Sequence, residues 1–292
     1  MKKQFLSLML LSTLLGCNQK TNNNNTQEEK KENTPSVTSK EDFGVFLGLQ
    51  EDNYQKLLSY KKVAIEIEEF SSSVIDELKS NGIEIYAYLS VGSLEKYRPY
   101  YNEFKNYTFM DYDNWPHERW IDVSQKSWQD HIKDTASSFK NMGANGLFLD
   151  NFDVYYIASE EYECSTSFKE GIYEGCKTIL SNLSTLEMSL LLNSGSTFLE
   201  RLDEEHDSLI DKVDWYAQES VFSSIIDYEN NIFGKQNEED HNYYLEIIEM
   251  MKEKSSILLI EYTEDQNLIE EIESYCKSNN FSCYITNRVN LD

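Results

Sequence analysis

The sequence predicts an α/β protein made of a single (β/α)8 TIM barrel. Eight short apolar segments recur between residue 43 and the end of the chain, and most are followed by a segment with helical spacing of apolar residues. Regular alternation of this kind predicts a parallel sheet. Eight such units in about 250 residues match the size of one closed barrel. An open doubly wound sheet is the alternative, but "FLGLQEDNY" is not the glycine-rich loop that usually follows its first strand.

The expected strands are short runs rich in apolar and β-branched residues, as in "KVAIEIEEF". They span residues 43–48, 62–70, 83–92, 146–150, 188–195, 213–220, 256–263 and 281–287. The fourth strand runs from Gly146 to Asp150 and meets a second acid, Asp153, three residues later. Carboxylates that directly follow an apolar strand indicate the point where the barrel core ends and a solvent-facing site begins.

Helical segments are expected between most of these strands. In the first of them, residues 71–82, three serines are N-cap candidates and Gly82 is a C-cap candidate. The others span residues 124–142, 165–183, 197–212, 239–253 and 265–279. The stretch between the third strand and the next helix is long and has no regular pattern.

The N-terminus has the features of an export signal. Lys2 and Lys3 precede an apolar run that is too short to span a membrane. "LLGC" resembles a bacterial lipobox, which predicts lipidation of Cys17; ordinary signal cleavage beside an incidental cysteine is the alternative. We therefore expect a lipoprotein signal peptide at 1–17, a disordered polar linker at 18–40 and the barrel at 41–292. The protein would lie outside the cytoplasm and contact the membrane through its lipid anchor only.

The chain is strongly acidic, with a formal net charge of −26. The signal contributes only two lysines and the linker is almost neutral, so the negative charge belongs to the barrel. Nucleic acid is excluded as a partner because its phosphates would be repelled. A cationic or neutral ligand is favoured, although a soluble, self-repelling surface would give the same charge. The 20 tyrosines and 4 tryptophans suit a sugar-binding groove or the packing of a core.

Four cysteines remain after the signal: Cys164, Cys176, Cys276 and Cys283. An even number in an exported protein suggests disulfides, with three possible connectivities. Local pairing, Cys164–Cys176 and Cys276–Cys283, is the simplest prediction, and buried free thiols are the alternative. None of the four has C-x-x-C spacing, so zinc or thioredoxin-like chemistry has little support.

The residues at the ends of the strands indicate which chemistry the barrel performs, because active sites of such barrels lie there. They are Glu66, Tyr88, Asp150, Asp153, Asn193, Gln218, Glu219, Glu261 and Tyr262. The set contains no lysine for a Schiff base, and the four histidines form no metal-binding pair. No glycine-rich loop follows the last strands to hold a phosphate. We therefore expect neither a metal nor a cofactor.

Carboxylates, amides and tyrosines suit glycoside hydrolysis. One carboxyl group protonates the leaving oxygen, while the other attacks the sugar or activates water. Asp150 and Glu219, at the ends of the fourth and sixth strands, are the candidate catalytic pair. Alternatively, Asp150 only caps the next helix and Glu219 only marks the exposed end of its strand.

Five segments in order, among them "GLFLDN-x-D" and "QES", resemble glycoside hydrolase family 114, whose members are described as endo-α-1,4-polygalactosaminidases. The resemblance implies a (β/α)8 barrel with Asp150 and Glu219 as the catalytic pair. It also implies polymers of galactosamine as substrates, which are cationic when deacetylated and would suit an acidic domain. Residues in the other matching segments are candidates for substrate contact: Glu66, Asp122, Asp153 and Asn193.

We expect an exported, lipid-anchored glycosidase in which Glu219 is the general acid and Asp150 the nucleophile or base. Four further residues at or near strand ends are candidate substrate contacts: Tyr88, Tyr216, Glu261 and Tyr262. The alternative is a non-catalytic carbohydrate-binding lipoprotein on the same scaffold.

Overall fold

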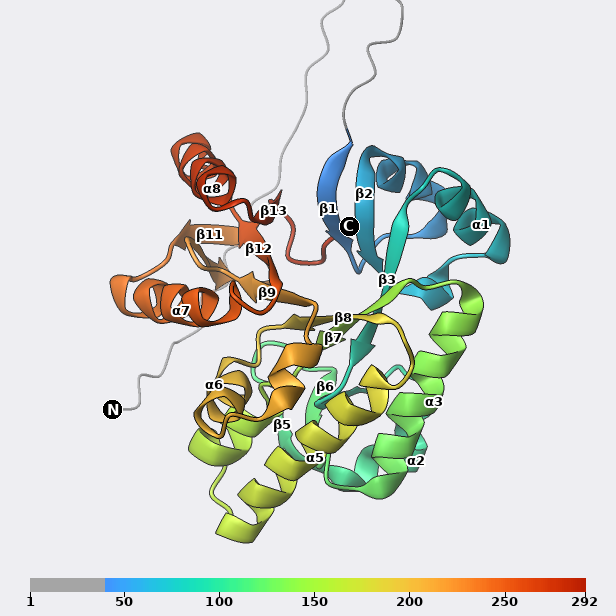
Figure 1. The fold of residues 1–292 in the computed structure, drawn as a ribbon, viewed down its shortest axis with the longest axis vertical. Helices are drawn as coiled ribbons and strands as arrows, with labels where there is room; N and C mark the ends of the chain where they lie inside the picture. The colour runs from blue at the N-terminus through green and yellow to red at the C-terminus, as the bar shows by residue number, and fades with distance from the viewer. Residues whose placement is uncertain (1–39) are drawn as a thin grey trace, which may run out of the picture. The chain divides into compact units, whose positions relative to one another are not determined.

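The computed structural model describes residues 40–292, so the predicted signal peptide, Cys17 and all but the last residue of the predicted linker lie outside the described residues. Eight parallel strands form one sheet in the order β1–β2–β3–β7–β8–β9–β12–β13 (Figure 1). Their bounds are β1 (Glu41–Phe46), β2 (Tyr60–Ile65), β3 (Glu84–Ser90), β7 (Gly146–Asp150), β8 (Ser189–Asn193), β9 (Trp215–Glu219), β12 (Ser256–Tyr262) and β13 (Ser282–Thr286). The sheet curls into a nearly closed barrel, and the predicted fold is confirmed.

The barrel closes where β1 and β13, the two ends of the sheet order, meet through their side chains. The ring of Phe46 lies 5.4 Å from that of Tyr284, and the Ser282 hydroxyl donates a hydrogen bond to the Asp42 carboxylate. Just beyond the two strands, the backbone N–H of Gly48 donates to the carbonyl of Leu291 at 3.1 Å. These contacts cover the two edges of the sheet, although β1 and β13 are not paired by backbone hydrogen bonds.

Helices cover the outside of the barrel (Figure 1). They are α1 (Ser72–Ser80), α3 (Lys126–Met142), α5 (Thr166–Ser184), α6 (Ser196–Glu204), α7 (Glu238–Met251) and α8 (Gln266–Asn279), with 3-10 helix η1 (Glu51–Ser59) in the first connection. Each packs one apolar face on the sheet; α3, for example, buries Trp128, Ile132 and Phe139. Within residues 40–292, no helix combines the length and the apolar character needed to cross a membrane.

The helix predicted over residues 197–212 is two elements. Helix α6 ends at Glu204, and His206 takes a left-handed backbone with φ of 53°. The Asp207 carboxylate then accepts the N–H of Leu209 and starts the 3-10 helix η5 (Ser208–Lys212). The spacing of apolar residues continues through this break, so the sequence pattern predicted one helix where His206 and Asp207 divide it into two.

Two insertions in the barrel were not predicted. After β3, an antiparallel sheet is formed by β4 (Ser93–Glu95), β6 (Glu118–Ile121) and β5 (Thr108–Asp111). After β9, β10 (Ser223–Asp227) and β11 (Ile232–Lys235) form a hairpin. Short helical pieces complete the connections: η2 (Ile67–Glu69), α2 (Tyr101–Phe104), η3 (Lys105–Tyr107), α4 (Val154–Tyr156) and the π-helix η4 (Ile157–Glu161). Strands of three to five residues show too little alternation of apolar and polar residues to be predicted from the sequence.

The barrel interior is filled by side chains. Phe43 packs against Tyr86 and Trp215, with ring centroids 5.2 and 5.5 Å apart. The Tyr86 hydroxyl crosses β7 and donates to Ser189 on β8 at 3.1 Å. A Cβ atom on Gly146 would lie 2.5 Å from the Tyr86 ring, so only glycine fits there.

The two predicted disulfides are absent from the structure, in which all four described cysteines are free thiols. Cys164 precedes α5 and donates to the carbonyl of Ala158. Cys176 lies ten residues into α5, about 15 Å along its axis, whereas a disulfide needs Cα atoms within about 7 Å. The Cys276 thiol donates to the carbonyl of Ser282 at 3.9 Å, and neither it nor Cys283 forms a disulfide in the structure. The predicted disulfides are therefore not confirmed: Cys176 and Cys276 are buried thiols, and Cys164 and Cys283 are partly buried ones.

Candidate active site

Three neighbouring strands end in the side chains at the centre of the site. Asp150, Asn193 and Glu219 are the last residues of β7, β8 and β9. The amide nitrogen Nδ2 of Asn193 donates to Oδ1 of Asp150 at 3.0 Å and to Oε1 of Glu219 at 2.7 Å. These two carboxylate oxygens are therefore no more than about 6 Å apart. The sequence-predicted pair is brought together by one bridging amide.

The second oxygen of each carboxylate is held by a tyrosine from the next strand outward. Tyr88 on β3 donates to Oδ2 of Asp150 at 3.0 Å, and the amide of Asn151 reaches the same oxygen at 3.4 Å. Tyr262 on β12 donates to Oε2 of Glu219 at 2.7 Å. Both acids are thus fixed at both oxygens before any substrate binds, as preorganised catalytic groups need to be.

Each of the three central strands ends in the same backbone turn. The residues that directly follow Asp150, Asn193 and Glu219 have positive φ: 68° at Asn151, 57° at Ser194 and 57° at Ser220. This left-handed conformation is tolerated by asparagine, as at Asn151, but is costly for a serine, as at Ser194 and Ser220. It ends the strand in a single residue, which leaves the preceding side chain at the mouth of the barrel. Three such turns side by side are backbone strain concentrated at the candidate site.

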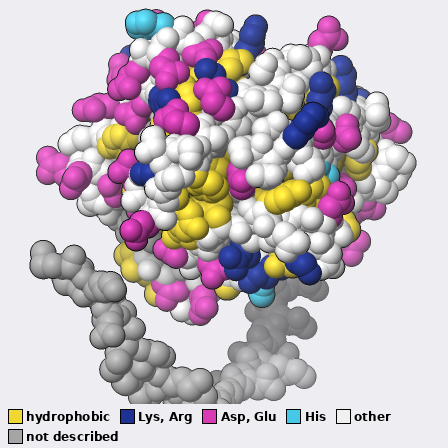
Figure 2. Space-filling model, turned by 90° about the horizontal axis from the view of Figure 1, so that it is seen from below, with side chains coloured by type: hydrophobic (Ala, Val, Ile, Leu, Met, Phe, Trp, Pro, Cys, Tyr) yellow, Lys and Arg dark blue, Asp and Glu magenta, His cyan; other side chains and the backbone are white. Residues whose placement is uncertain are grey.

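The strand ends lie in a cavity of about 760 Å³ with a strongly acidic lining. Its acidic residues are Glu66, Glu95, Glu118, Asp150, Asp153, Glu219 and Asp292. No lysine or arginine lines it. On the face shown in Figure 2, acidic side chains are widely spread, and hydrophobic side chains gather in patches between them.

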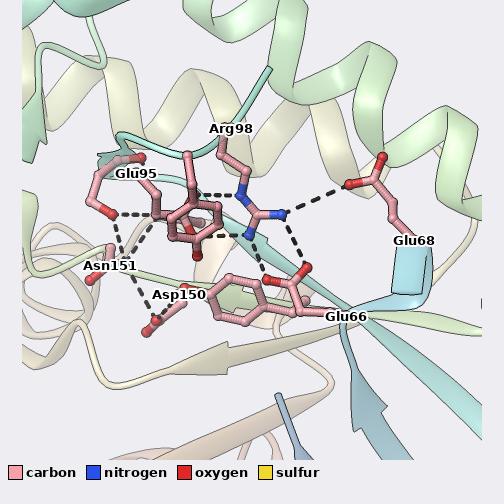
Figure 3. Close-up of polar contacts among 10 residues, drawn as sticks. Glu66, Glu68, Glu95, Arg98, Asp150 and Asn151 are labelled. Atoms are coloured by element: carbon pink, nitrogen blue, oxygen red, sulfur yellow. Dashed lines mark hydrogen bonds and ion pairs between the residues drawn. The ribbon is translucent and has the colours of Figure 1, made fainter. Parts of the chain in front are cut away.

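Arg98 binds two of the lining carboxylates but is not itself part of the lining. Arg98 donates to both oxygens of Glu95, at 2.7 and 2.9 Å, and to both oxygens of Glu66 (Figure 3). Its side chain is only 12% exposed. Burial still raises the pKa of Glu66, although Arg98 opposes the rise. Arg98 therefore holds two of the wall's carboxylates without presenting its own charge to the cavity.

Several carboxyl groups of the site retain protons near neutral pH. Burial, followed by the charge of Glu219, raises the pKa of Asp150 to about 7. Burial raises the pKa of Asp153 to about 6. The pKa of Glu118 rises to about 8 through burial and the charges of Glu95 and Asp150. Carboxylates this close do not all ionise together, so the charge of Glu219 opposes ionisation of Asp150.

We expect the protein to lose stability as the pH rises from about 5 to about 8. Asp150, Asp153 and Glu118 hold protons in the folded chain that the unfolded chain has already released at these pH values, so unfolding becomes easier as pH rises. Urea unfolding over this range measures the trend. Asp153→Asn removes one of the three groups and should flatten it. A stability that rises with pH over this window would contradict the assignment.

Seven of the predicted residues meet in the cavity: Glu66, Tyr88, Asp150, Asp153, Asn193, Glu219 and Tyr262. Asp153 also has a structural part. Both of its oxygens accept the backbone N–H of Gly195 at 3.2 Å. Gly195 has φ of 73°, so this contact fixes the left-handed start of α6.

Three predicted substrate contacts do not line the cavity. Asp122 accepts hydrogen bonds from Ser124 and Gln125 in the turn that precedes α3. Tyr216 is fully buried, and its hydroxyl bonds to Gln218. Glu261 is also fully buried and accepts three backbone N–H groups of the segment that follows β9. These residues support the site from outside it.

The cavity also contains residues that the sequence did not single out. They come mainly from the two insertions: Glu95, Tyr97, Tyr112, Trp115, Glu118 and Tyr228. The clustered rings of "YRPYY" and "NWPHERW" were the available signal. Among residues 40–292, no three or more metal-ligating side chains form a group that could hold an ion.

Comparisons with known proteins agree with this geometry. The model of glycoside-hydrolase family GH114 matches residues 22–292. The chain resembles the glycoside hydrolase domain of PelA from Pseudomonas aeruginosa, with a TM-score of 0.71 and 18% identity over 86% of this chain and 96% of that one. It also resembles Aspergillus fumigatus Ega3, solved in complex with galactosamine, with a TM-score of 0.61 and 17% identity over 90% and 96% of the two chains. An uncharacterized protein of Methanocaldococcus jannaschii is 23% identical over 218 residues. The matched part is 72% of this chain and 60% of that relative's length.

Proposed function

Because the chain belongs to glycoside hydrolase family GH114 and is a glycoside hydrolase, we propose that it cleaves a galactosamine-containing polysaccharide with Asp150 and Glu219 as its catalytic pair. The observation that carries the proposal is the single amide of Asn193, which bridges the two carboxylates at the mouth of the barrel. Two carboxyl groups held at short range across a cleft are the recurring device of glycoside hydrolysis.

The short separation favours a mechanism that retains the configuration of the sugar. Inverting enzymes keep their carboxyl groups roughly 6.5–9.5 Å apart, because a water molecule must fit between one of them and the sugar. The bridged oxygens of Asp150 and Glu219 are closer than that. One carboxylate can therefore attack the anomeric carbon directly.

Hydrogen bonding favours one assignment of the two roles. Asp150 accepts from Asn193, Tyr88 and Asn151, whereas Glu219 accepts from Asn193 and Tyr262. The bonds from Asn193 and Tyr88 favour the charged form of Asp150 against the burial that raises its pKa to about 7, and Asp150 is ionised above that pH. Asp150 is the nucleophile: it bonds to the anomeric carbon while the carboxyl group of Glu219 gives its proton to the leaving oxygen. Water then attacks the glycosyl ester, Glu219 takes the water's proton, and Asp150 leaves as a carboxylate.

The acidic cavity favours sugars that carry a positive charge. Seven acidic residues and no lysine or arginine line it. Arg98 pairs with two of them and three others hold protons near neutral pH, but a nearby ammonium group would favour ionisation of those three and would be attracted. Deacetylated galactosamine units carry such a group. The galactosamine in the Ega3 complex supports this substrate class by analogy with a protein of the same fold.

Release of reducing ends tests the proposed function. The purified protein should release them from partly deacetylated α-1,4-linked polygalactosamine faster than from the fully acetylated polymer. Equal rates on both would remove the charge argument. No release from either would contradict the substrate class.

We also propose that the chain is exported and anchored by a lipid on Cys17, which lies outside the described residues. The support is "LLGC" after a short apolar run with Lys2 and Lys3 at its start. Mass spectrometry of the cellular protein should find a lipidated Cys17 as the first residue. An intact N-terminus with unmodified Cys17 would contradict the proposal.

A further inference from the structure

The two insertions of the barrel meet over the candidate active site. The small β4–β6–β5 sheet follows β3, and the β10–β11 hairpin follows β9. In the sheet order, β7 and β8 lie between β3 and β9. A contact between the insertions therefore reaches across the ends of β7 and β8, where Asp150 and Asn193 lie.

One aromatic pair makes this contact. Trp115 lies between β5 and β6, and Tyr228 lies in the turn between β10 and β11. Their ring centroids are 6.0 Å apart and their planes meet at 81°, an edge-to-face contact. Both rings line the cavity, so the pair bridges it from one insertion to the other.

Each insertion is fixed at its base close to one catalytic acid. Tyr112 stacks on Trp120 with centroids 4.3 Å apart, and its hydroxyl donates to Asn151, the residue after Asp150. On the other side, Phe233 of the hairpin stacks on Tyr262, whose hydroxyl holds Glu219. The joint between Trp115 and Tyr228 is less enclosed, since 38% of the Trp115 surface is exposed. The bases are fixed, and the joint is the part that can open.

We propose that Trp115 and Tyr228 form an aromatic clasp that opens to admit a polysaccharide chain and then stacks on its sugar rings. The inference rests on the proposed function. A closed edge-to-face pair leaves no room for a sugar between the rings, so a chain that passes between the two insertions separates them. Once they are apart, the faces of both rings are free to pack on the apolar C–H faces of sugars. The clasp would thus act on long chains more than on short ones.

Binding to a catalytically inactive parent tests the clasp. In an Asp150→Asn background, titration calorimetry would compare a long, partly deacetylated galactosamine oligosaccharide with the disaccharide. We expect Trp115→Ala and Tyr228→Ala each to weaken binding of the long chain by about tenfold, with a smaller loss for the disaccharide and partial recovery in Trp115→Phe. Tyr156→Ala is the matched control, because Tyr156 is 40% exposed and lies outside the cavity lining.

The outcomes separate the clasp from the function on which it rests. If the parent binds the long chain and both alanine variants bind it equally well, the clasp is wrong and the proposed function stands. An equal loss for the long chain and the disaccharide would also overturn the clasp, because the rings would then act only at the central sugars. If the parent binds no galactosamine oligosaccharide, the substrate class and the clasp are both wrong.

Discussion

Asp150→Asn and Glu219→Gln are each expected to lower turnover of the polysaccharide by at least about 100-fold. Both changes keep the shape of the side chain and remove its proton chemistry or its nucleophilic oxygen, and general acid–base catalysis alone contributes about 10²–10⁴-fold. The comparison is of kcat on the same polymer at the same pH. Near-normal turnover in either variant would remove that residue from the catalytic pair.

The choice of leaving group separates the two roles. An activated aryl glycoside departs without a proton, so Glu219→Gln should recover much of the first step on such a substrate. Asp150→Asn should not recover, because the attacking oxygen is gone whatever the leaving group. The reverse pattern would exchange the roles of nucleophile and acid while leaving the pair intact.

Two controls exclude loss of fold as the cause. Asp150 has a pKa of about 7 because its charge is buried beside Glu219, so removing the charge should leave the protein at least as stable near neutral pH. Asp122→Asn is the matched control for activity, because Asp122 lies in the turn before α3 and does not line the cavity. It should keep turnover within about twofold, as changes away from a site usually do.

The pair could be predicted from the sequence because two simple rules locate it. Apolar runs of strand length end at Asp150 and Glu219, and parallel strands of a barrel present their C-terminal ends at one mouth. Asn193 follows by the same reasoning, since its strand lies between the other two. What the sequence does not contain is the bridge itself, because rotamers decide which amide hydrogen reaches which oxygen.

Alternation of side chains along a strand explains why two predicted substrate contacts, Glu261 and Tyr216, do not line the cavity. Successive side chains of a strand point to opposite faces, so Glu261 and Tyr262 cannot both face the barrel mouth, and Tyr262 does. Tyr216 likewise lies three positions before Glu219 on β9, so the two side chains point to opposite faces of the strand.

The clasp could not be predicted from strand alternation. Trp115 and Tyr228 are far apart in sequence, and they meet only because two insertions with weak local patterns lean together.

Glu261→Ala is expected to destabilise the fold by about 4 kcal/mol or more. Glu261 is completely buried, and its carboxylate accepts the backbone N–H groups of Val221, Phe222 and Ser223, as well as the Ser223 hydroxyl. Alanine would leave these donors buried without partners, and each unsatisfied donor costs about 1–3 kcal/mol. Urea unfolding measures the loss.

Two further variants make this test independent of whether the alanine variant folds. Glu261→Gln keeps one accepting oxygen and should lose only part of the stability. Glu270→Ala, which removes an exposed carboxylate from α8, should change stability by no more than about 0.5 kcal/mol. If Glu261→Gln is as stable as the native chain and Glu261→Ala costs less than about 1 kcal/mol, water replaces the carboxylate and the anchor is unimportant.

The anchor matters for the site because the segment it holds begins directly after the acid Glu219 and leads into the hairpin that carries Tyr228. Loosening residues 221–223 should therefore move the end of β9 and the clasp together. We expect Glu261→Gln to lower turnover of the long polymer more than turnover of an aryl glycoside, because the short substrate needs Glu219 and Asp150 but not the hairpin. An equal loss on both substrates would place the effect at Glu219 alone.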